Sequence, residues 1–150
     1  MGLMIAQRQP DWEISFSDFC DRRALLPFEW GLNDCLHFTL DGIHALTTKR
    51  VWNSPGCSSA SDAHEKLKAQ GGLEALVESI AQRCKWMELV EPWLTASRGD
   101  LVLFKNADRL CVGLADVGVV LSPGAHGLAS EKTKSVVRAW HIPYGKEGVV

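Results

Sequence analysis

The chain has 150 residues, a hydrophobic fraction of 46% and a formal net charge of −2. This length suits one domain with its own core, and the composition is that of an ordinary globular protein. The slight negative charge argues against a nucleic-acid binder, which needs cationic contacts to phosphate. No apolar run approaches the roughly 20 residues of a membrane-spanning helix, so we expect no membrane span.

The five cysteines are widely spaced and include no Cys-x-x-Cys pair. This pattern argues against a zinc ribbon or a ferredoxin-like site. We therefore expect neither a metal nor a cofactor. The opening residues 1–6 are too short for a signal peptide, and polar residues follow at once, so we expect synthesis in the cytoplasm.

Taken in chain order, the first residues predict an arm and then a helix. Residues 1–13 read as an N-terminal arm of a single domain, with a core over about residues 14–142. Apolar positions in residues 14–26 form a rough helical stripe. Pro27 ends that stripe, because the residue before a proline is pushed out of the helical region.

Residues 33–46 predict the central helix of the domain. Its wide apolar face indicates a helix buried on most sides, and Gly42 within it would allow close packing on a strand. Asn33 is expected to cap the helix, and Asp34 would place a negative charge at the positive end of the helix dipole. Cys35 then falls in the first turn, a position that favours the thiolate form.

The later residues predict two further helices and then an antiparallel sheet. A loop with a turn signal at residues 53–56 separates the central helix from helices over residues 61–70 and 73–84. From residue 99 onward the periodicity changes to that of strands, expected at 99–104, 110–114, 117–121 and 136–142. Helices followed by an antiparallel sheet predict an α+β fold.

Two motifs resemble a known family. Two segments are similar to motifs of the NlpC-type, papain-like cysteine peptidase superfamily: Trp-Gly-Leu-Asn-Asp-Cys at residues 30–35 and Gly-Asp-Leu-Val at residues 99–102. They resemble in particular the branch encoded among tail genes of long-tailed bacteriophages. The resemblance covers about residues 24–142 and implies N-terminal helices packed on a C-terminal antiparallel sheet. It implies Cys35 as the nucleophile position.

Trp30, Asn33 and Asp34, within the first motif, are the candidate binding residues. The resemblance also implies a base, and here the sequence departs from the family. The family's base histidine is replaced by Cys111, and the nearest match to its third polar residue is Ser122.

Cysteine catalysis needs a proton acceptor within reach of the sulfur. His37 points to another side of the helix from Cys35, and His44 lies about 13 Å along the axis. His126 and His141 are therefore the alternative bases that the sequence offers.

The same alignment predicts that Cys35 and Cys111 face each other across the cleft. They would then form a disulfide on oxidation or pack as small apolar groups. A metal site made of these two thiols and His126 is a weaker alternative, because three distant residues do not form a motif.

We consider three functions and favour the first, with the second as the alternative. The first is a phage tail-tip or baseplate component, or a tail-assembly protein, with degenerate catalysis; its partners would be other tail proteins and its final location the virion tail. The second is an active peptidoglycan endopeptidase that uses Cys35 to help the tail penetrate the cell wall. The third is a cytosolic amidase or thioesterase, which nothing in the sequence selects.

Overall fold

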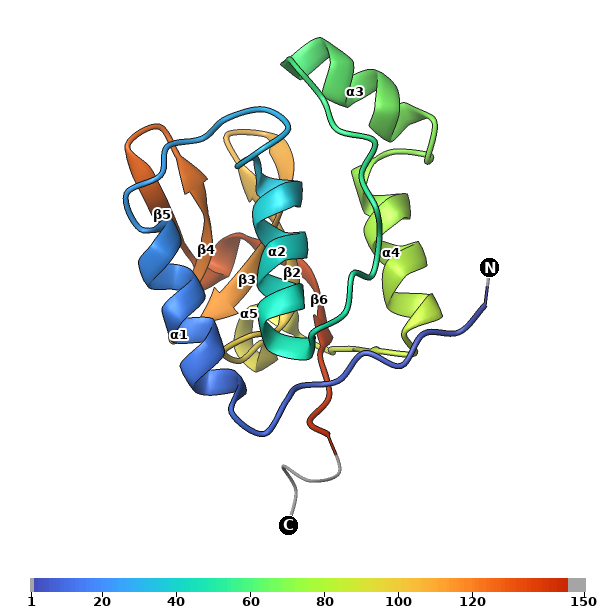
Figure 1. Cartoon of the computed structure of the whole chain (residues 1–150), viewed down its shortest axis with the longest axis vertical. Coiled ribbons are helices and arrows are strands. Elements are labelled where there is room, and N and C mark those ends of the chain that lie inside the picture. The colour runs from blue at the N-terminus through green and yellow to red at the C-terminus, as the bar shows by residue number, and fades with distance from the viewer. Residues whose placement is uncertain (1, 146–150) are drawn as a thin grey trace.

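The computed structural model describes residues 2–145 and shows helices packed on one antiparallel sheet (Figure 1). The helices are α1 (Trp12–Arg23), α2 (Cys35–Thr47), α3 (Ala60–Lys68), α4 (Leu73–Arg83), the short α5 (Pro92–Thr95) and the 3-10 helix η1 (Thr133–Ser135). The strands are β1 (Met87–Glu88), β2 (Leu101–Asn106), β3 (Arg109–Asp116), β4 (Val119–Gly124), β5 (Gly127–Lys132) and β6 (Val136–His141). The α+β prediction, with helices first and an antiparallel sheet afterwards, is confirmed.

Within residues 2–145, the six strands form one sheet in the order β1-β6-β2-β3-β4-β5. Each neighbouring pair is antiparallel. The sequence pattern missed β1, α5 and β5, which are short or lie on half-exposed, polar segments. The strand expected at residues 117–121 is longer in the structure, where β4 continues through Pro123 to Gly124.

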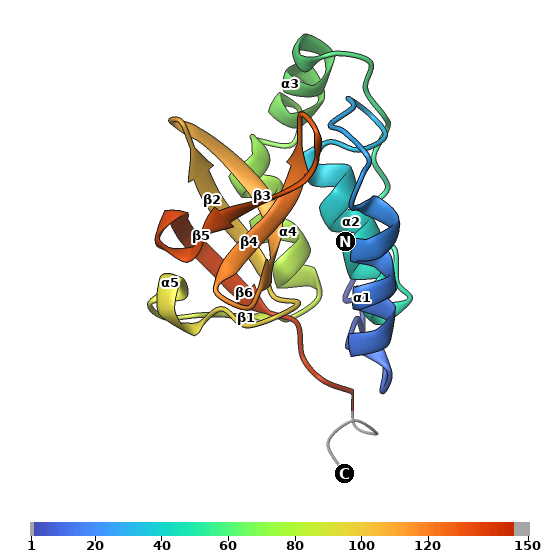
Figure 2. The same cartoon turned by 90° about the vertical axis from the view of Figure 1, so that its left-hand side faces the viewer.

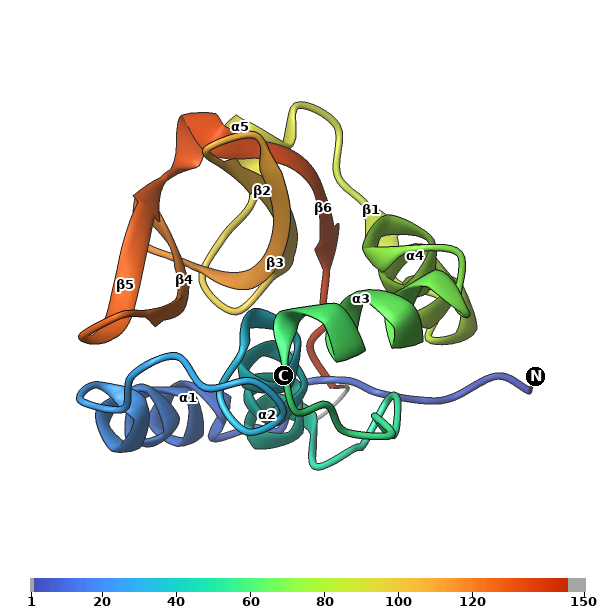
Figure 3. The same ribbon diagram turned by 90° about the horizontal axis from the view of Figure 1, so that it is seen from above.

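The central helix α2 packs against β3 and β4, with α1 beside it on the same side of the sheet (Figure 2). Seen from above, the sheet is strongly curved, and α1 and α2 lie side by side across its lower side (Figure 3). Gly42 sits where α2 meets β3: an added Cβ would lie 2.2 Å from Leu114 Cδ1. The predicted close packing at Gly42 is therefore confirmed. None of the helices in residues 2–145 has the length and apolar character to cross a membrane.

Apolar side chains alternate between the two faces of the sheet, as the two-residue repeat of a strand requires. Leu101 and Leu103 of β2 join the core shared with the helices. Val102 and Phe104 belong to a second buried cluster on the opposite face. The sheet is therefore buried on both sides at β2, which explains its continuous apolar sequence.

Arg8 anchors the N-terminal arm to the end of the sheet at which β2 begins and β6 ends. Its side chain is fully buried and donates from Nε to the Ile142 carbonyl at 2.7 Å. It also forms an ion pair with Asp100 at 2.8 Å. The arm is thus part of the folded domain, because its arginine satisfies a buried carboxylate.

Candidate functional site

Asp34, and not Asn33, is the N-cap of α2. The Asp34 backbone is extended, with ψ of 175°, and its Oδ1 accepts from the His37 main-chain N–H at 2.8 Å. Its Oδ2 accepts from the Gly31 main-chain N–H at 3.0 Å. The expectation that Asn33 caps the helix is therefore wrong: the helix begins one residue later, at Cys35, and the carboxylate takes the capping role.

Asn33 instead fixes the loop that leads into α2. Its buried Nδ2 donates to the carbonyls of Leu26 and Pro27, at 3.2 and 3.0 Å. Its Oδ1 accepts from Arg23 at 2.7 Å. These bonds connect the end of α1 to the start of α2, so Asn33 positions the loop and does not line the cleft described below.

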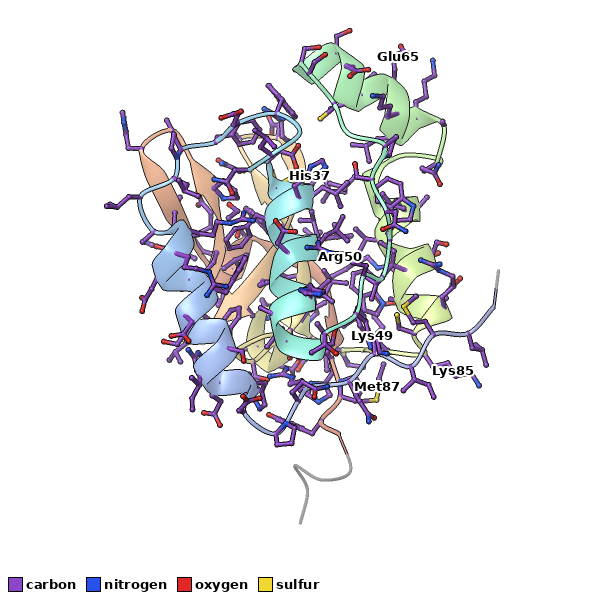
Figure 4. All side chains as sticks on the ribbon, viewed as in Figure 1. His37, Lys49, Arg50, Glu65, Lys85 and Met87 are labelled. Carbon is purple, nitrogen blue, oxygen red and sulfur yellow. The ribbon has the colours of Figure 1, made fainter. Side chains whose placement is uncertain are left out.

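The Asp34 carboxylate has two further partners, His37 and Cys57. His37 Nδ1 lies 2.7 Å from Oδ1, and the Cys57 thiol donates to Oδ2 at 3.5 Å. Burial alone would raise the pKa of Asp34, but the hydrogen bonds from His37 and Gly31 outweigh it and hold that pKa below its ordinary value. The same bond raises the pKa of His37. His37, labelled in Figure 4, lies at the start of α2 with its ring committed to this carboxylate.

Cys35, the first residue of α2, interacts with the Cys111 thiol of β3, which also donates to the Arg109 carbonyl at 3.9 Å. This interaction, together with burial, raises the pKa of Cys35 well above its ordinary value. The Val112 main-chain N–H has the opposite effect, because its interaction with the Cys35 sulfur lowers the pKa of Cys35. The interaction with Cys35 lowers the pKa of Cys111 to about 7.

Cys111 is therefore the more acidic of the two thiols. The expectation that the helix start favours a Cys35 thiolate does not hold here, because the neighbouring thiolate and burial oppose a second charge at that position. Cys111, like Cys35, is half-buried, and it packs against the second core cluster.

The two thiols lie in a cleft of about 820 Å³. Its wall includes three other residues that the sequence pointed to, Trp30, Asp34 and Ser122. Trp30 is half-buried and packs edge-on against Phe28, with ring centroids 4.7 Å apart. Ser122 is buried on β4, one strand away from Cys111. The structure thus brings Cys35, Cys111, Ser122 and Trp30 to one cleft.

The two histidines offered as alternative bases lie outside this cleft. His126 is exposed in the turn between β4 and β5. His141 ends β6, and its Nδ1 lies 2.9 Å from the buried Asp100 Oδ1. The strand register also places His141 far from Cys111. Cys111 pairs with Phe104 at one end of β2, whereas Trp140, the neighbour of His141, pairs with Leu101 at the other end.

The cleft residues that the sequence pattern did not single out include Trp52, Cys57 and His64. They come from the loop after α2 and from α3, which closes one side of the cleft. Only the turn signal at residues 53–56 hinted that this loop folds back. Within residues 2–145, no group of three or more His, Cys, Asp or Glu side chains is arranged to hold a metal ion.

The crystal structure of a wild-type endolysin, LysIME-EF1, has a similar fold, with a TM-score of 0.51 and 12% sequence identity. The alignment covers 96% of this chain and 67% of that one, and at this identity it shows likeness of fold alone. A search of curated proteins finds no match. A family model described as a domain of unknown function, DUF6950, matches residues 7–142. This match spans nearly the whole described chain, arm and closing strand included, and the protein therefore belongs to the DUF6950 family.

Proposed function

We propose that this chain is a component of a phage tail tip or baseplate, or a tail-assembly protein, built on a papain-like scaffold that has lost its hydrolytic chemistry. Its partners are other tail proteins, and its final location is the virion tail. The resemblance of residues 30–35 and 99–102 to the NlpC-type branch encoded among tail genes supports the phage context. The fold shared with an endolysin, a class of phage peptidoglycan hydrolases, is consistent with it.

The observation that carries the loss of hydrolysis is the contact between Cys35 and Cys111. A cysteine peptidase needs a base that takes the proton of its nucleophile and later returns it to the leaving amine. Here a second thiol, Cys111, stands where the family has an imidazole. The raised pKa of Cys35 keeps this sulfur protonated, which opposes attack on a carbonyl.

A second function, an active peptidoglycan endopeptidase, is favoured by a different observation. Cys35 opens into a cleft whose wall includes the aromatic side chains of Trp30 and Trp52. In that case the thiolate of Cys111 would have to take the proton of Cys35. With this function, the protein binds peptidoglycan and helps the tail to penetrate the cell wall.

Two measurements separate these functions. The first incubates the purified protein with peptidoglycan sacculi and quantifies soluble muropeptides. We expect no release above that of Cys35→Ala; release by the wild type that is lost in Cys35→Ser would establish the endopeptidase instead. The Cys111→His variant, which restores the family's residue, tests whether the cleft can still support hydrolysis.

The second measurement examines tails made by a phage that encodes this chain. We expect the protein in purified virions by mass spectrometry, and Cys35→Ala should leave the yield of complete tails unchanged. Deletion of the gene should lower that yield. Normal tails from the deletion strain, together with absence of the protein from virions, would contradict the proposal.

A further inference from the structure

One side of the cleft is closed by α3, a helix with no buried residue. Most of its cleft-lining positions, which are 60, 63, 64, 67 and 68, have the three- and four-residue spacing of one helix face. The apolar side chains of Ala63 and Leu67 on that face belong to half-buried residues. Figure 1 shows α3 beyond the start of α2, apart from the sheet. The apolar face of α3 is therefore directed at the cleft and only partly covered.

A second wall of the cleft is an incompletely paired strand. Strand β3 pairs with β2 over residues 109–114, but with β4 only over residues 114–116. In the described part of the chain, β2 is thus the one strand neighbour of residues 109–113. Leu110 and Cys111 belong to that stretch and line the cleft. A strand edge without a neighbouring strand is a place where an extended peptide can add.

Aromatic and aliphatic side chains line the space beside these two walls. Trp30, Trp52 and Leu110 are half-buried residues of the cleft. Trp52 and Leu110 pack against the core, and what they leave uncovered contributes to the cleft surface. An apolar side chain placed against them would be removed from water, which favours binding.

Two cationic residues of the cleft lack an acidic partner. Lys68 comes from α3 and Arg109 begins β3, and both are exposed. Neither forms an ion pair within the part of the chain that the structure describes. The third cation, Lys66, pairs with Asp62 at 3.2 Å and donates to the Gly56 carbonyl at 2.6 Å. The uncompensated positive charge therefore comes from both walls.

Asp34 is the one acidic side chain among the described lining residues. It is buried, and its oxygens accept bonds from Gly31, His37 and Cys57. The carboxylate is thus committed to the start of α2 and not to the cations of α3 and β3. The whole chain carries a net charge of −2, so the cationic lining is a local feature and not a consequence of composition. This lining complements an anionic ligand.

We propose that the cleft holds an extended, acidic segment of a partner protein. The segment adds along the edge of β3 at residues 109–113, packs apolar side chains against Trp52 and Leu67, and places carboxylates beside Lys68 and Arg109. This inference rests on the proposed function and names the surface that holds the partner. A cleft without hydrolysis retains such a segment, whereas an active peptidase would cleave it.

The test uses fluorescence anisotropy of a fluorescein-labelled peptide, in which glutamate and leucine alternate, on the intact protein. Three matched peptides replace glutamate by lysine, replace leucine by serine, or carry N-methylated amides that cannot pair with a strand. We expect the acidic, apolar peptide to bind and the three matched peptides to bind at least about tenfold more weakly. Added salt should also weaken binding of the acidic peptide, because it screens exposed charges.

Substitutions locate the bound peptide in the cleft. The double variant Lys68→Glu with Arg109→Glu should raise the Kd at least about tenfold, whereas Lys49→Glu should leave it unchanged. Lys49 is also exposed, but it follows the end of α2 that lies away from the cleft (Figure 4). Trp52→Ala should weaken binding, and Trp93→Ala, on α5 and outside the cleft, should not. Circular dichroism checks that each variant is folded.

A second readout needs no substitution. Cys57 and Cys111 line the cleft, whereas Cys20 is half-buried on α1 and outside it. A saturating concentration of the acidic peptide should slow the alkylation of Cys57 and Cys111 by iodoacetamide. Alkylation of Cys20 should stay unchanged, as mass spectrometry of the peptides quantifies.

Several outcomes would overturn the proposal: equal affinity for the lysine peptide, a Kd that the double variant does not change, or no protection of Cys111. Displacement of the acidic peptide by muropeptides would also overturn it, because the cleft would then be a peptidoglycan site. The virion measurement stays a separate test of the proposed function. A protein that is present in virions but does not bind the acidic peptide would contact the tail through another surface.

Discussion

His37 Nδ1 lies 2.7 Å from the Asp34 Oδ1 that caps the same helix, so one carboxylate oxygen serves both the backbone and the ring of His37. Both side chains are largely shielded, at 18% and 6% exposed, which limits solvent screening of the pair. The bond raises the pKa of His37 above its ordinary value of 6.5. Protonation of His37 is therefore linked to folding.

The first prediction concerns the pH dependence of stability. A group whose folded pKa is raised stabilises the fold fully below its unfolded pKa, here about 6.5, and loses that contribution as the pH rises through the folded pKa. The free energy of unfolding of the wild type should thus decline above about pH 6.5 by an amount that His37→Gln lacks. Urea unfolding of both proteins over this range measures the difference. Parallel pH profiles would contradict the prediction.

The second prediction concerns Gly31, which joins the α1–α2 loop to the loop that carries Cys57. Its φ is +83°, and an added Cβ would lie 2.1 Å from the Cys57 carbonyl oxygen. We expect Gly31→Ala to lower the free energy of unfolding by more than the roughly 1–2 kcal/mol of the left-handed backbone alone. It should also speed modification of Cys57, because the bond to Asp34 would be displaced.

Gly118→Ala is the matched control for that variant. Gly118 also has a positive φ, +71°, but nothing lies within 4 Å of its added Cβ. It should therefore show the backbone cost without the collision. Equal destabilisation by the two variants in chemical unfolding would mean that the loop at Cys57 shifts to accommodate the added Cβ without a cost in free energy.

The third prediction concerns the buried ion pair of the N-terminal arm. Arg8 donates to Asp100 and to the carbonyls of Arg98 and Ile142, and none of its side chain is exposed. Arg8→Ala leaves the Asp100 carboxylate buried without its cation, which typically costs about 3–5 kcal/mol. Arg50→Ala is the surface control: Arg50 pairs with Asp41 but is 48% exposed, so its loss should cost at most about 1 kcal/mol. Similar midpoints of denaturant unfolding for the two variants would contradict this account.

Most of the fold follows from periodicity in the sequence. The wide apolar stripe of residues 33–46 indicated a buried central helix, and the change of period after residue 99 indicated the sheet. The capping residue was misplaced, because Asn33 and Asp34 are both good caps and only the tertiary bonds of Asn33 to the end of the α1 segment decide between them. Strand β5 was not predicted, because apolar and polar residues alternate too weakly along it.

The cleft was predictable where it depends on local order and not where it depends on long-range packing. The motif at residues 30–35 located Cys35 at a helix start, and the resemblance aligned Cys111 with it. The loop with Cys57 and the helix with His64 reach the cleft through the fold, at positions that no spacing rule links to Cys35. The distribution of charge between the two thiols likewise depends on burial and on a hydrogen bond.

The fourth prediction uses that distribution. The hydrogen bond from Cys35 lowers the pKa of Cys111 to about 7, against an ordinary 9.0, so iodoacetamide should alkylate Cys111 with a rate that rises with pH around a midpoint near 7. In Cys35→Ala the donor is lost, and the midpoint should move upward toward 9.0. Cys57→Ser, which leaves both thiols in place, should keep the wild-type midpoint. Quantifying the Cys111 peptide by mass spectrometry across the pH series gives each curve. A midpoint that Cys35→Ala does not move would show that Cys111 gains its acidity elsewhere, and the thiol pair would then not act as one unit.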